Sequence, residues 1–226
     1  MKLMNTKVIF PAVMGACVLA ANTFAGTYAN ITIDGNTADW ASVPVAYSDA
    51  TVDAAPIDLA TIQLANDNNY LYIRLTYGTA VNPNGGSGVF LAVDNDNNPA
   101  TGFDVYGLGL VGAEAGWQND FPFEQATGVF NTGGGITGGA GAISPYFTTT
   151  TEQEYAISRS ATFTASSLPV FPGNSFTLLA YTVDGTADVA GPVQYTFASV
   201  PEPTSLTLVG LGLLMTVRLV HRRRNH

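Results

Sequence analysis

Carboxylate and amide side chains alternate in one short stretch of the chain, VDNDNNPATGFD at 93–104. Asp94, Asp96 and Asn98 are spaced by two residues, and Asp104 follows ten residues after Asp94. Oxygen ligands at alternate positions of a turn can converge on a hard cation such as calcium. Two interpretations stay open: a site for calcium or another weakly held cation, and a polar turn in which Asp and Asn bond their own backbone.

The same stretch departs from the EF-hand calcium loop at two positions. With Asp94 counted as the first residue, Pro99 occupies the position of the turn glycine. Val105 stands where the closing glutamate would be. The case for a cation therefore rests on ligand type and spacing alone.

The body of the chain, residues 26–200, is acidic and lacks many catalytic side chains. It holds sixteen acidic residues and two basic ones, Arg74 and Arg159, a net charge of −14 against −9 for the whole chain. This charge repels phosphate backbones, so no nucleic acid partner is expected. The body has no Cys, His or Met, which excludes disulfides, His- or Cys-dependent nucleophiles and His/Met haem ligation.

Two other kinds of site can be weighed from sequence patterns. Matches to G-x-G-x-x-G at 107–112 and 133–138 are not followed by a predicted helix, so no nucleotide site is expected. Glycoside hydrolysis needs a pair of carboxylates. Glu114, Asp120 and Glu124 lie near one another in the sequence, but nothing identifies a pair. We therefore expect a protein without catalytic residues.

Short strands must position these side chains. In the segment 70–77, Leu71, Ile73, Leu75 and Tyr77 share one face, and the turn cluster NDNN precedes it, which predicts a hairpin with the run before the turn. No stretch of ten or more residues in the body has a helical period. These features predict an all-β fold, an antiparallel β-sandwich of jelly-roll or immunoglobulin-like type over 26–199. Further strand-like runs lie at 29–33, 87–94, 103–112, 121–130, 154–163, 175–184 and 192–197.

Trp40 lies between the turn signal Asp34-Gly35-Asn36 and the apolar Val43-Pro44-Val45. An indole in this setting could stack on a sugar ring or anchor the turn onto the edge of the core. We favour the anchor, because a lone tryptophan beside a turn more often packs inward.

Four segments occur in the order seen in DOMON-like domains: ITIDGNTADWASVPV, LANDNNYLYIRLTYG, VFLAVDNDNNPATGFD and EYAISRSATF. The body resembles in particular the glucodextranase C-terminal type and the family-nine carbohydrate-binding modules. The resemblance implies a β-sandwich that binds sugars, in some members with calcium, and the absence of His and Met sets the chain apart from the haem-binding branch. It further implies an aromatic platform, for which Trp117, Phe121 and Phe123 are the candidates; the same rings could instead fill the core.

The N-terminal residues have the layout of a secretory leader. Lys2 and Lys7 precede an apolar run, 8–21, and small residues follow at 23–25. The run is short for a membrane span, so we predict a signal peptide over 1–25, cleaved after Ala25.

The segment 200–226 combines three features in order. Val200, Pro201, Glu202 and Pro203 come first, a short apolar helix is predicted at about 205–220, and Arg222, Arg223 and Arg224 follow. The apolar part is shorter than a full span, and the arginines would hold that end in the cytoplasm. The segment resembles the PEP-CTERM sorting signal, which implies recognition by an exosortase in a Gram-negative bacterium that exports polysaccharide; an ordinary single-span anchor is the alternative.

Together these features predict an exported, surface-sorted β-sandwich that binds extracellular polysaccharide without catalysis. A structural or adhesive surface protein without a defined ligand and a small glycoside-active enzyme are the alternatives. An exposed row of aromatic rings would favour polysaccharide binding over the structural alternative. Expected partners are the exosortase, the secretion machinery and a polysaccharide.

Overall fold

The computed structural model describes residues 22–49, 52–86, 88–183 and 185–200. This part consists of strands and two short 3-10 helices, η1 and η2. The elements are β1 (Asn22–Ala25), η1 (Thr37–Ser42), β2 (Val45–Ser48), β3 (Leu59–Asn66), β4 (Tyr70–Val81), β5 (Val89–Asp94), η2 (Val105–Gly107), β6 (Ala115–Gln118), β7 (Phe121–Glu124), β8 (Ile136–Thr137), β9 (Ala142–Ser144), β10 (Thr150–Ser158), β11 (Thr162–Phe163), β12 (Ser175–Thr182) and β13 (Val189–Thr196).

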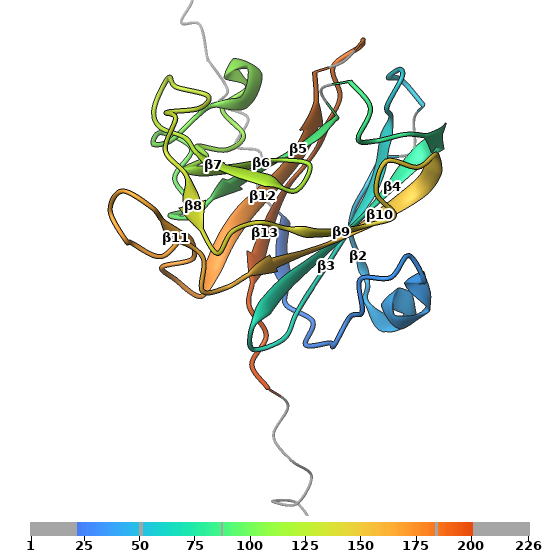
Figure 1. Cartoon of the computed structure of the whole chain (residues 1–226), viewed down its shortest axis with the longest axis horizontal. Coiled ribbons are helices and arrows are strands. Elements are labelled where there is room, and N and C mark those ends of the chain that lie inside the picture. The colour runs from blue at the N-terminus through green and yellow to red at the C-terminus, as the bar shows by residue number, and fades with distance from the viewer. Residues whose placement is uncertain (1–21, 50–51, 87, 184, 201–226) are drawn as a thin grey trace, which may run out of the picture.

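The strands form two facing sheets (Figure 1). One sheet has the order β1-β13-β12-β5-β6-β7, the other has the order β2-β3-β4-β10-β9, and β8 pairs with β11 as a separate ribbon. The pairs within these sheets are antiparallel except β1 with β13, which is parallel. The predicted antiparallel β-sandwich is confirmed.

The β3–β4 hairpin forms where the turn cluster predicted it. The side chain of Asp67 accepts hydrogen bonds from the backbone amides of Asn69 and Tyr70, each at 2.7 Å, which closes the turn. Leu71, Ile73 and Leu75 then all point into the space between the sheets, and each is fully buried. The period-2 pattern of β4 thus sets the inner face of its sheet.

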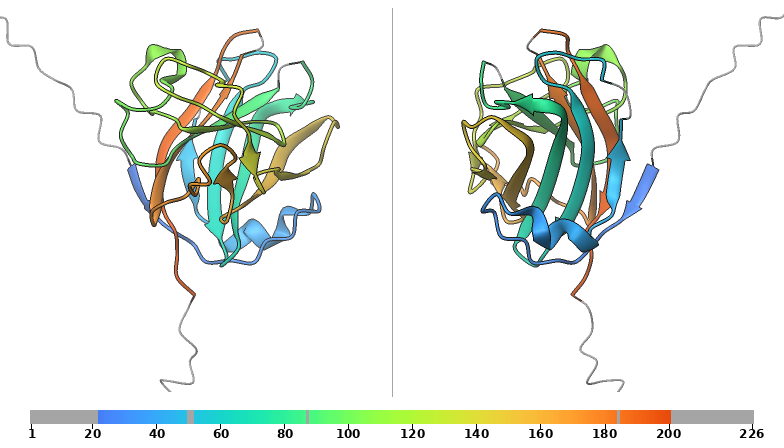
Figure 2. Two further views of the ribbon diagram at one scale, coloured as in Figure 1. Left: turned by 60° about the vertical axis from the view of Figure 1, so that its left-hand side comes forward. Right: turned by 90° about the vertical axis from the view of Figure 1, so that its right-hand side faces the viewer.

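Three apolar clusters hold the layers together. The largest lies between the sheets, a second covers the outer face of β5 and β12, and a third covers the outer face of β3 and β4. Figure 2 shows the loops that close over these outer faces. Because both faces of the central strands are buried, alternation along a strand does not by itself say which side chains reach solvent.

Two predicted strands are absent. The segment 103–112 is a loop with η2, since Tyr106, Gly107 and Gly109 have φ of 57°, 69° and 66°, a left-handed backbone that a strand cannot contain. The segment 29–33 lies beside β3 and makes one backbone hydrogen bond to it, from the N–H of Ala29 to the carbonyl oxygen of Asn66. It buries Ile31 in the third cluster instead of forming a strand.

The structure describes the last residues of the predicted leader and the first residues after β13. β1 consists of residues that we assign to the leader, so cleavage after Ala25 would remove this strand from β13. Gly26 packs so closely on β13 that an added Cβ would lie 2.0 Å from the carbonyl oxygen of Thr196. The segment after β13 leaves the sandwich at the end that holds the β3–β4 turn (Figures 1 and 2).

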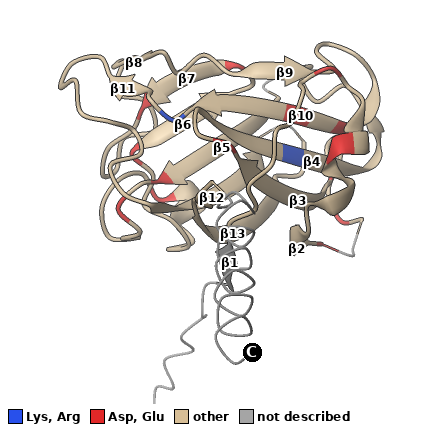
Figure 3. Cartoon of the chain, turned by 90° about the horizontal axis from the view of Figure 1, so that it is seen from below, with Lys and Arg blue, Asp and Glu red and all other residues tan. Residues whose placement is uncertain are grey.

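The predicted leader up to residue 21 and the predicted helix at 205–220 lie outside the described residues. Among the residues that are described, no helix is long and apolar enough to cross a membrane. In Figure 3 the acidic residues are spread over many loops and strands, whereas basic residues are few.

Candidate functional site

The Asp94 loop follows β5 and is ordered by its own polar groups. The amide of Asn98 donates to Asp94 Oδ1 at 3.0 Å and to Asp96 Oδ1 at 2.9 Å, and the amide of Gly112 donates to Asp94 Oδ2 at 3.2 Å. Asp94 is buried, and burial raises its pKa although these two amides lower it. The backbone contacts are those expected of a polar turn.

A third carboxylate, that of Glu114, joins this loop from the position just before β6. Carboxylate oxygens of Asp94, Asp96 and Glu114 lie within 4.8 Å of one another. Burial raises the pKa of Glu114 to about 7, helped by the nearby charges of Asp96 and Asp94 and opposed by a hydrogen bond from the amide of Asn95. Glu114 Oε1 is buried and has no hydrogen-bond partner. Three converging carboxylates of this kind could hold a hard cation.

The other two predicted ligands are used differently. Asp104 is outside the carboxylate group, and its Oδ1 accepts from the amide of Gly109 at 2.8 Å in the loop around η2. The backbone N–H of Asn98 donates within the turn, and its side-chain Oδ1 accepts a hydrogen bond from the backbone N–H of Ala100. The cluster that the structure forms therefore comprises Asp94, Asp96 and Glu114.

The three candidate platform aromatics do not share a surface. Trp117 has an exposed fraction of 0%, lies between the sheets and donates from Nε1 to the carbonyl oxygen of Gly139 at 2.7 Å. Phe123 is buried in the cluster on the outer face of the same sheet. Phe121 is 65% exposed. The platform expected from all three is not formed, because two of the rings belong to the core.

Phe121 borders a groove of about 460 Å³ beside the β6–β7 turn. Its apolar lining includes Pro122 and Ile136, and its polar groups include Asp120, Thr137 and Thr164. The hydroxyls of the two threonines lie 3.0 Å apart at an exposed position. The groove thus offers an aromatic face next to hydroxyl and carboxylate groups.

Two further exposed aromatic residues extend this surface, and the sequence analysis did not single them out. Tyr146 donates from its hydroxyl to Asp120 Oδ1 at 2.9 Å. Phe147 packs edge-on against Tyr146, with ring centroids 4.5 Å apart, and is 59% exposed. Asp120 therefore links the groove at Phe121 to a second aromatic patch.

Trp40 is an anchor, as we favoured. Its exposed fraction is 1%, and it packs with Val43 and Tyr72 in the third cluster. Its Nε1 donates to Glu154 Oε1 at 2.7 Å. Burial raises the pKa of Glu154, against the hydrogen bonds from Trp40 and from the amide of Gly35. Trp40 presents no face on which a sugar could stack.

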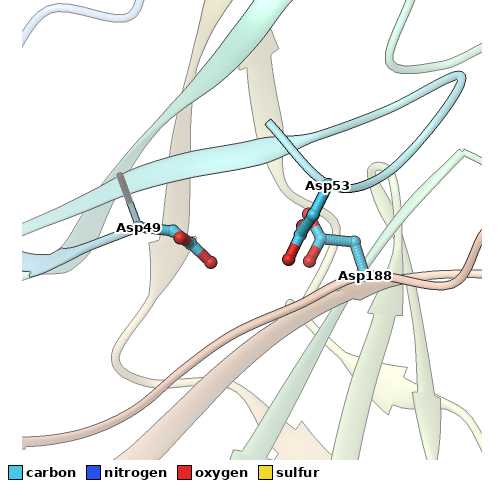
Figure 4. A group of neighbouring side chains, drawn as sticks. All are labelled: Asp49, Asp53 and Asp188. Atoms are coloured by element: carbon cyan, nitrogen blue, oxygen red, sulfur yellow. The ribbon is translucent and has the colours of Figure 1, made fainter. Parts of the chain in front are cut away.

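A second carboxylate group comprises Asp49, Asp53 and Asp188 (Figure 4), with oxygens within 4.8 Å of one another. Burial raises the pKa of Asp188. Its two oxygens accept from the amides of Leu59, at 2.6 Å, and Val189, at 2.7 Å. Because these amides already bind Asp188, the geometry alone assigns this group no function.

The fold is similar to solved carbohydrate-binding modules. A family 9 carbohydrate-binding module from Caldicellulosiruptor kristjanssonii in complex with cellotriose aligns with a TM-score of 0.46 and 12% identity, over 80% of this chain and 95% of that one. A structure of a family 9 module from the same organism with glucose aligns with a TM-score of 0.47 and 12% identity, over 80% and 98%. No curated protein matches the chain.

The tail is identified independently of the fold. Residues 199–224 match the family described as the PEP-CTERM protein-sorting motif. Val200, half-exposed after β13, is the last of these residues within the described part of the chain. The predicted residues from Pro201 to Arg224 lie outside it. The chain therefore carries a PEP-CTERM protein-sorting motif at residues 199–224.

Proposed function

We propose that this protein is exported, sorted by an exosortase through residues 199–224, and binds extracellular polysaccharide without catalysis in the groove beside Phe121. The observation that carries the binding proposal is the exposed Phe121 ring next to Asp120 and the threonine pair. A sugar has apolar C–H faces and hydroxyl edges, so it needs a flat apolar surface beside a few polar groups.

A glycan array tests this proposal. The full chain, purified in detergent, should bind neutral oligosaccharides, and Phe121→Ala should weaken that binding about tenfold, the loss expected when one aromatic stacking surface is removed. Phe121→Tyr keeps a ring at this position and is the matched control. A blank array would contradict the binding proposal and favour a structural or adhesive surface protein.

The sorting proposal has a separate test. The predicted topology has the sandwich outside and the arginines inside the cytoplasmic membrane, followed by release near the Pro-Glu-Pro triplet to the cell surface or matrix. Mass spectrometry of the mature protein from exosortase-competent cells should show the loss of residues 1–25 and of the segment after the triplet. A protein that keeps residues 204–226 would contradict processing.

We also propose that calcium binds at Asp94, Asp96 and Glu114. The unpartnered Glu114 Oε1 supports this proposal, because a buried carboxylate oxygen without a donor is costly unless a cation or proton joins it. Calorimetry should detect calcium binding in the full chain and none in Asp96→Asn, which keeps the turn oxygen but removes a charge. Equal melting temperatures with calcium and with chelator would favour the polar turn alone.

A further inference from the structure

A second cavity lies at the end of the sandwich where the β3–β4 turn meets the segments after β10 and β13. Its volume is about 450 Å³. Its lining is mainly polar and shares no residue with the groove at Phe121. The residues that offer polar atoms or an exposed ring to it are Asn68, Asn69, Tyr70, Ser158, Arg159 and Ser160.

Arg159 is fixed in the wall of this cavity. Its guanidinium carbon lies 4.1 Å from the centroid of the buried Phe197 ring, and Nη1 donates to the carbonyl oxygen of Asp67 at 2.6 Å. Stacking on a ring and one backbone contact restrict a side chain that would otherwise be flexible. The guanidinium is therefore held in place before any ligand arrives.

Most donors of this guanidinium have no hydrogen-bond partner among the described residues. Among the described residues, the ion pair within 4.0 Å is Arg74 with Glu152, and Arg159 has no carboxylate at that distance. Arg74 donates from Nε and Nη2 to Glu152 and from Nη1 to Gln63. Arg159 has five N–H donors, and within the described part of the chain one of them is used, in the bond from Nη1 to the carbonyl oxygen of Asp67.

The carboxylate of Asp67, whose pKa the charge of Arg159 lowers, has hydrogen-bond partners of its own. Burial raises its pKa, but hydrogen bonds from the amides of Asn69 and Tyr70 and from the hydroxyl of Tyr72, together with the positive charge of Arg159, hold the pKa below its usual value. Asp67 is thus a structural group of the turn. Its carboxylate and the guanidinium, both described by the structure, form no ion pair within 4.0 Å, so the N–H donors of Arg159 that this contact would use stay open to an external anion.

We propose that this cavity binds the carboxylate of an acidic sugar unit, a uronate within a saccharide, through the guanidinium of Arg159. The planar fork of arginine matches a carboxylate with two parallel hydrogen bonds. The sugar hydroxyls can form hydrogen bonds with the side-chain amides of Asn68 and Asn69. They can also bond the hydroxyls of Ser158 and Ser160, which lie 2.9 Å from each other. Tyr70, 43% exposed, supplies a ring face.

The charge of the body favours this ligand over a densely charged one. With a net charge of −14 over residues 26–200, a phosphate-rich membrane surface is repelled. One carboxylate in a saccharide instead meets the guanidinium at short range, where this attraction outweighs the repulsion from the more distant acidic groups. The proposal stands whether or not the groove at Phe121 binds a glycan.

Calorimetry on the full chain in detergent, with trigalacturonic acid and its methyl triester as probes, tests the proposal. The acid should bind, and the uncharged ester should bind at least about tenfold more weakly, since a hydrogen bond to a charged group is lost. Arg159→Gln should cause a similar loss for the acid. Phe121→Ala, in the other groove, is the matched control and should leave acid binding unchanged.

A second variant keeps the test decisive if Arg159→Gln fails to fold. Ser160 is exposed, so Ser160→Asp should keep the melting temperature and still abolish acid binding by repulsion. Equal binding of acid and ester, acid binding that survives either variant, or no acid binding at millimolar concentration would overturn the proposal. So would inorganic phosphate binding as tightly as the acid, or Arg159-dependent binding to phosphatidylglycerol vesicles in place of the trisaccharide.

Discussion

The groove at Phe121 and the cavity at Arg159 have nearly equal volumes, about 460 and 450 Å³, but opposite chemistry. At the groove an aromatic ring is exposed and forms the surface itself. At the cavity a buried ring, Phe197, supports the guanidinium of the lining residue Arg159. The same residue type thus provides a contact surface in one place and a support for charge in the other.

This difference implies that neutral and acidic saccharides would be bound independently. Dispersion and burial of C–H faces, which salt affects little, would dominate at Phe121. A charge-assisted hydrogen bond would dominate at Arg159 and weaken as ions screen it.

The largest effect is expected at Trp117, whose ring lies in the core behind the groove. Trp117→Ala should destabilise the fold by about 3–5 kcal/mol, because it leaves a large cavity between the sheets. Urea unfolding measures this change. Phe121→Ala, at an exposed position, should change stability by less than about 0.5 kcal/mol, and a large loss there would contradict our description of Phe121 as a surface residue.

Trp117→Phe should disturb the groove with a smaller loss of stability than Trp117→Ala. It keeps most of the apolar volume but removes the hydrogen bond to the carbonyl oxygen of Gly139, which precedes the groove residue Ala140. We expect a loss of about 1 kcal/mol in stability and weaker binding of neutral oligosaccharides. Acid binding by Trp117→Phe should match that of the unaltered chain; if it falls as well, the two regions are coupled through the core.

Salt should distinguish the two regions without any substitution. Between about 0.05 and 0.5 M sodium chloride, the affinity for trigalacturonic acid should fall several-fold, because the Debye length shortens to a few ångströms. The affinity for neutral oligosaccharides should stay within the error of calorimetry. A salt dependence of equal size for both ligands would contradict the separation.

Phe197→Leu tests the support beneath Arg159. Leucine keeps an apolar contact but removes the ring face, so the cation–π attraction of about 0.5–1 kcal/mol is lost. Binding of the acid should weaken by about two- to fivefold, less than in Arg159→Gln. An affinity as low as that of Arg159→Gln would indicate that the variant misplaces the whole cavity wall.

The smallest effect concerns pH and the buried Glu154. Its pKa is raised above the ordinary 4.5, so the folded state takes up a proton that the unfolded state releases. Its contribution to stability should therefore be full below pH 4.5 and decrease as the pH rises through the folded-state pKa. Melting curves from pH 4 to 7 for the unaltered chain and Glu154→Gln should differ in slope in this direction; parallel slopes would contradict it.

The sequence predicts the β3–β4 hairpin and the sandwich well, because Leu71, Ile73 and Leu75 alternate strictly and Asp67 begins a turn. It does not predict the partner of Asp94. Glu114 reaches the loop only because β6 pairs with β5, with Val93 opposite Ala115, and a pairing between strands separated by a long loop leaves no local pattern.

The aromatic residues around the β6–β7 turn show a second limit. Trp117 and Phe123 lie in clusters on opposite faces of one sheet, and both faces are covered. Alternation therefore could not separate buried from exposed rings, and only the turn beside Phe121 leaves its ring in solvent. The sequence does not indicate a binding role for Arg159 for a related reason: the ring that supports its guanidinium, Phe197, comes from a distant part of the chain, just after β13.

The most direct test of the central claim uses the polysaccharide of the cells that make the protein. A chain that carries Arg159→Gln should still co-sediment with this extracellular polysaccharide through the groove, and adding Phe121→Ala should shift most of the protein to the supernatant while keeping its melting temperature. The account would be contradicted if the Arg159→Gln chain stayed in the supernatant, or if the double variant sedimented as well as Arg159→Gln alone.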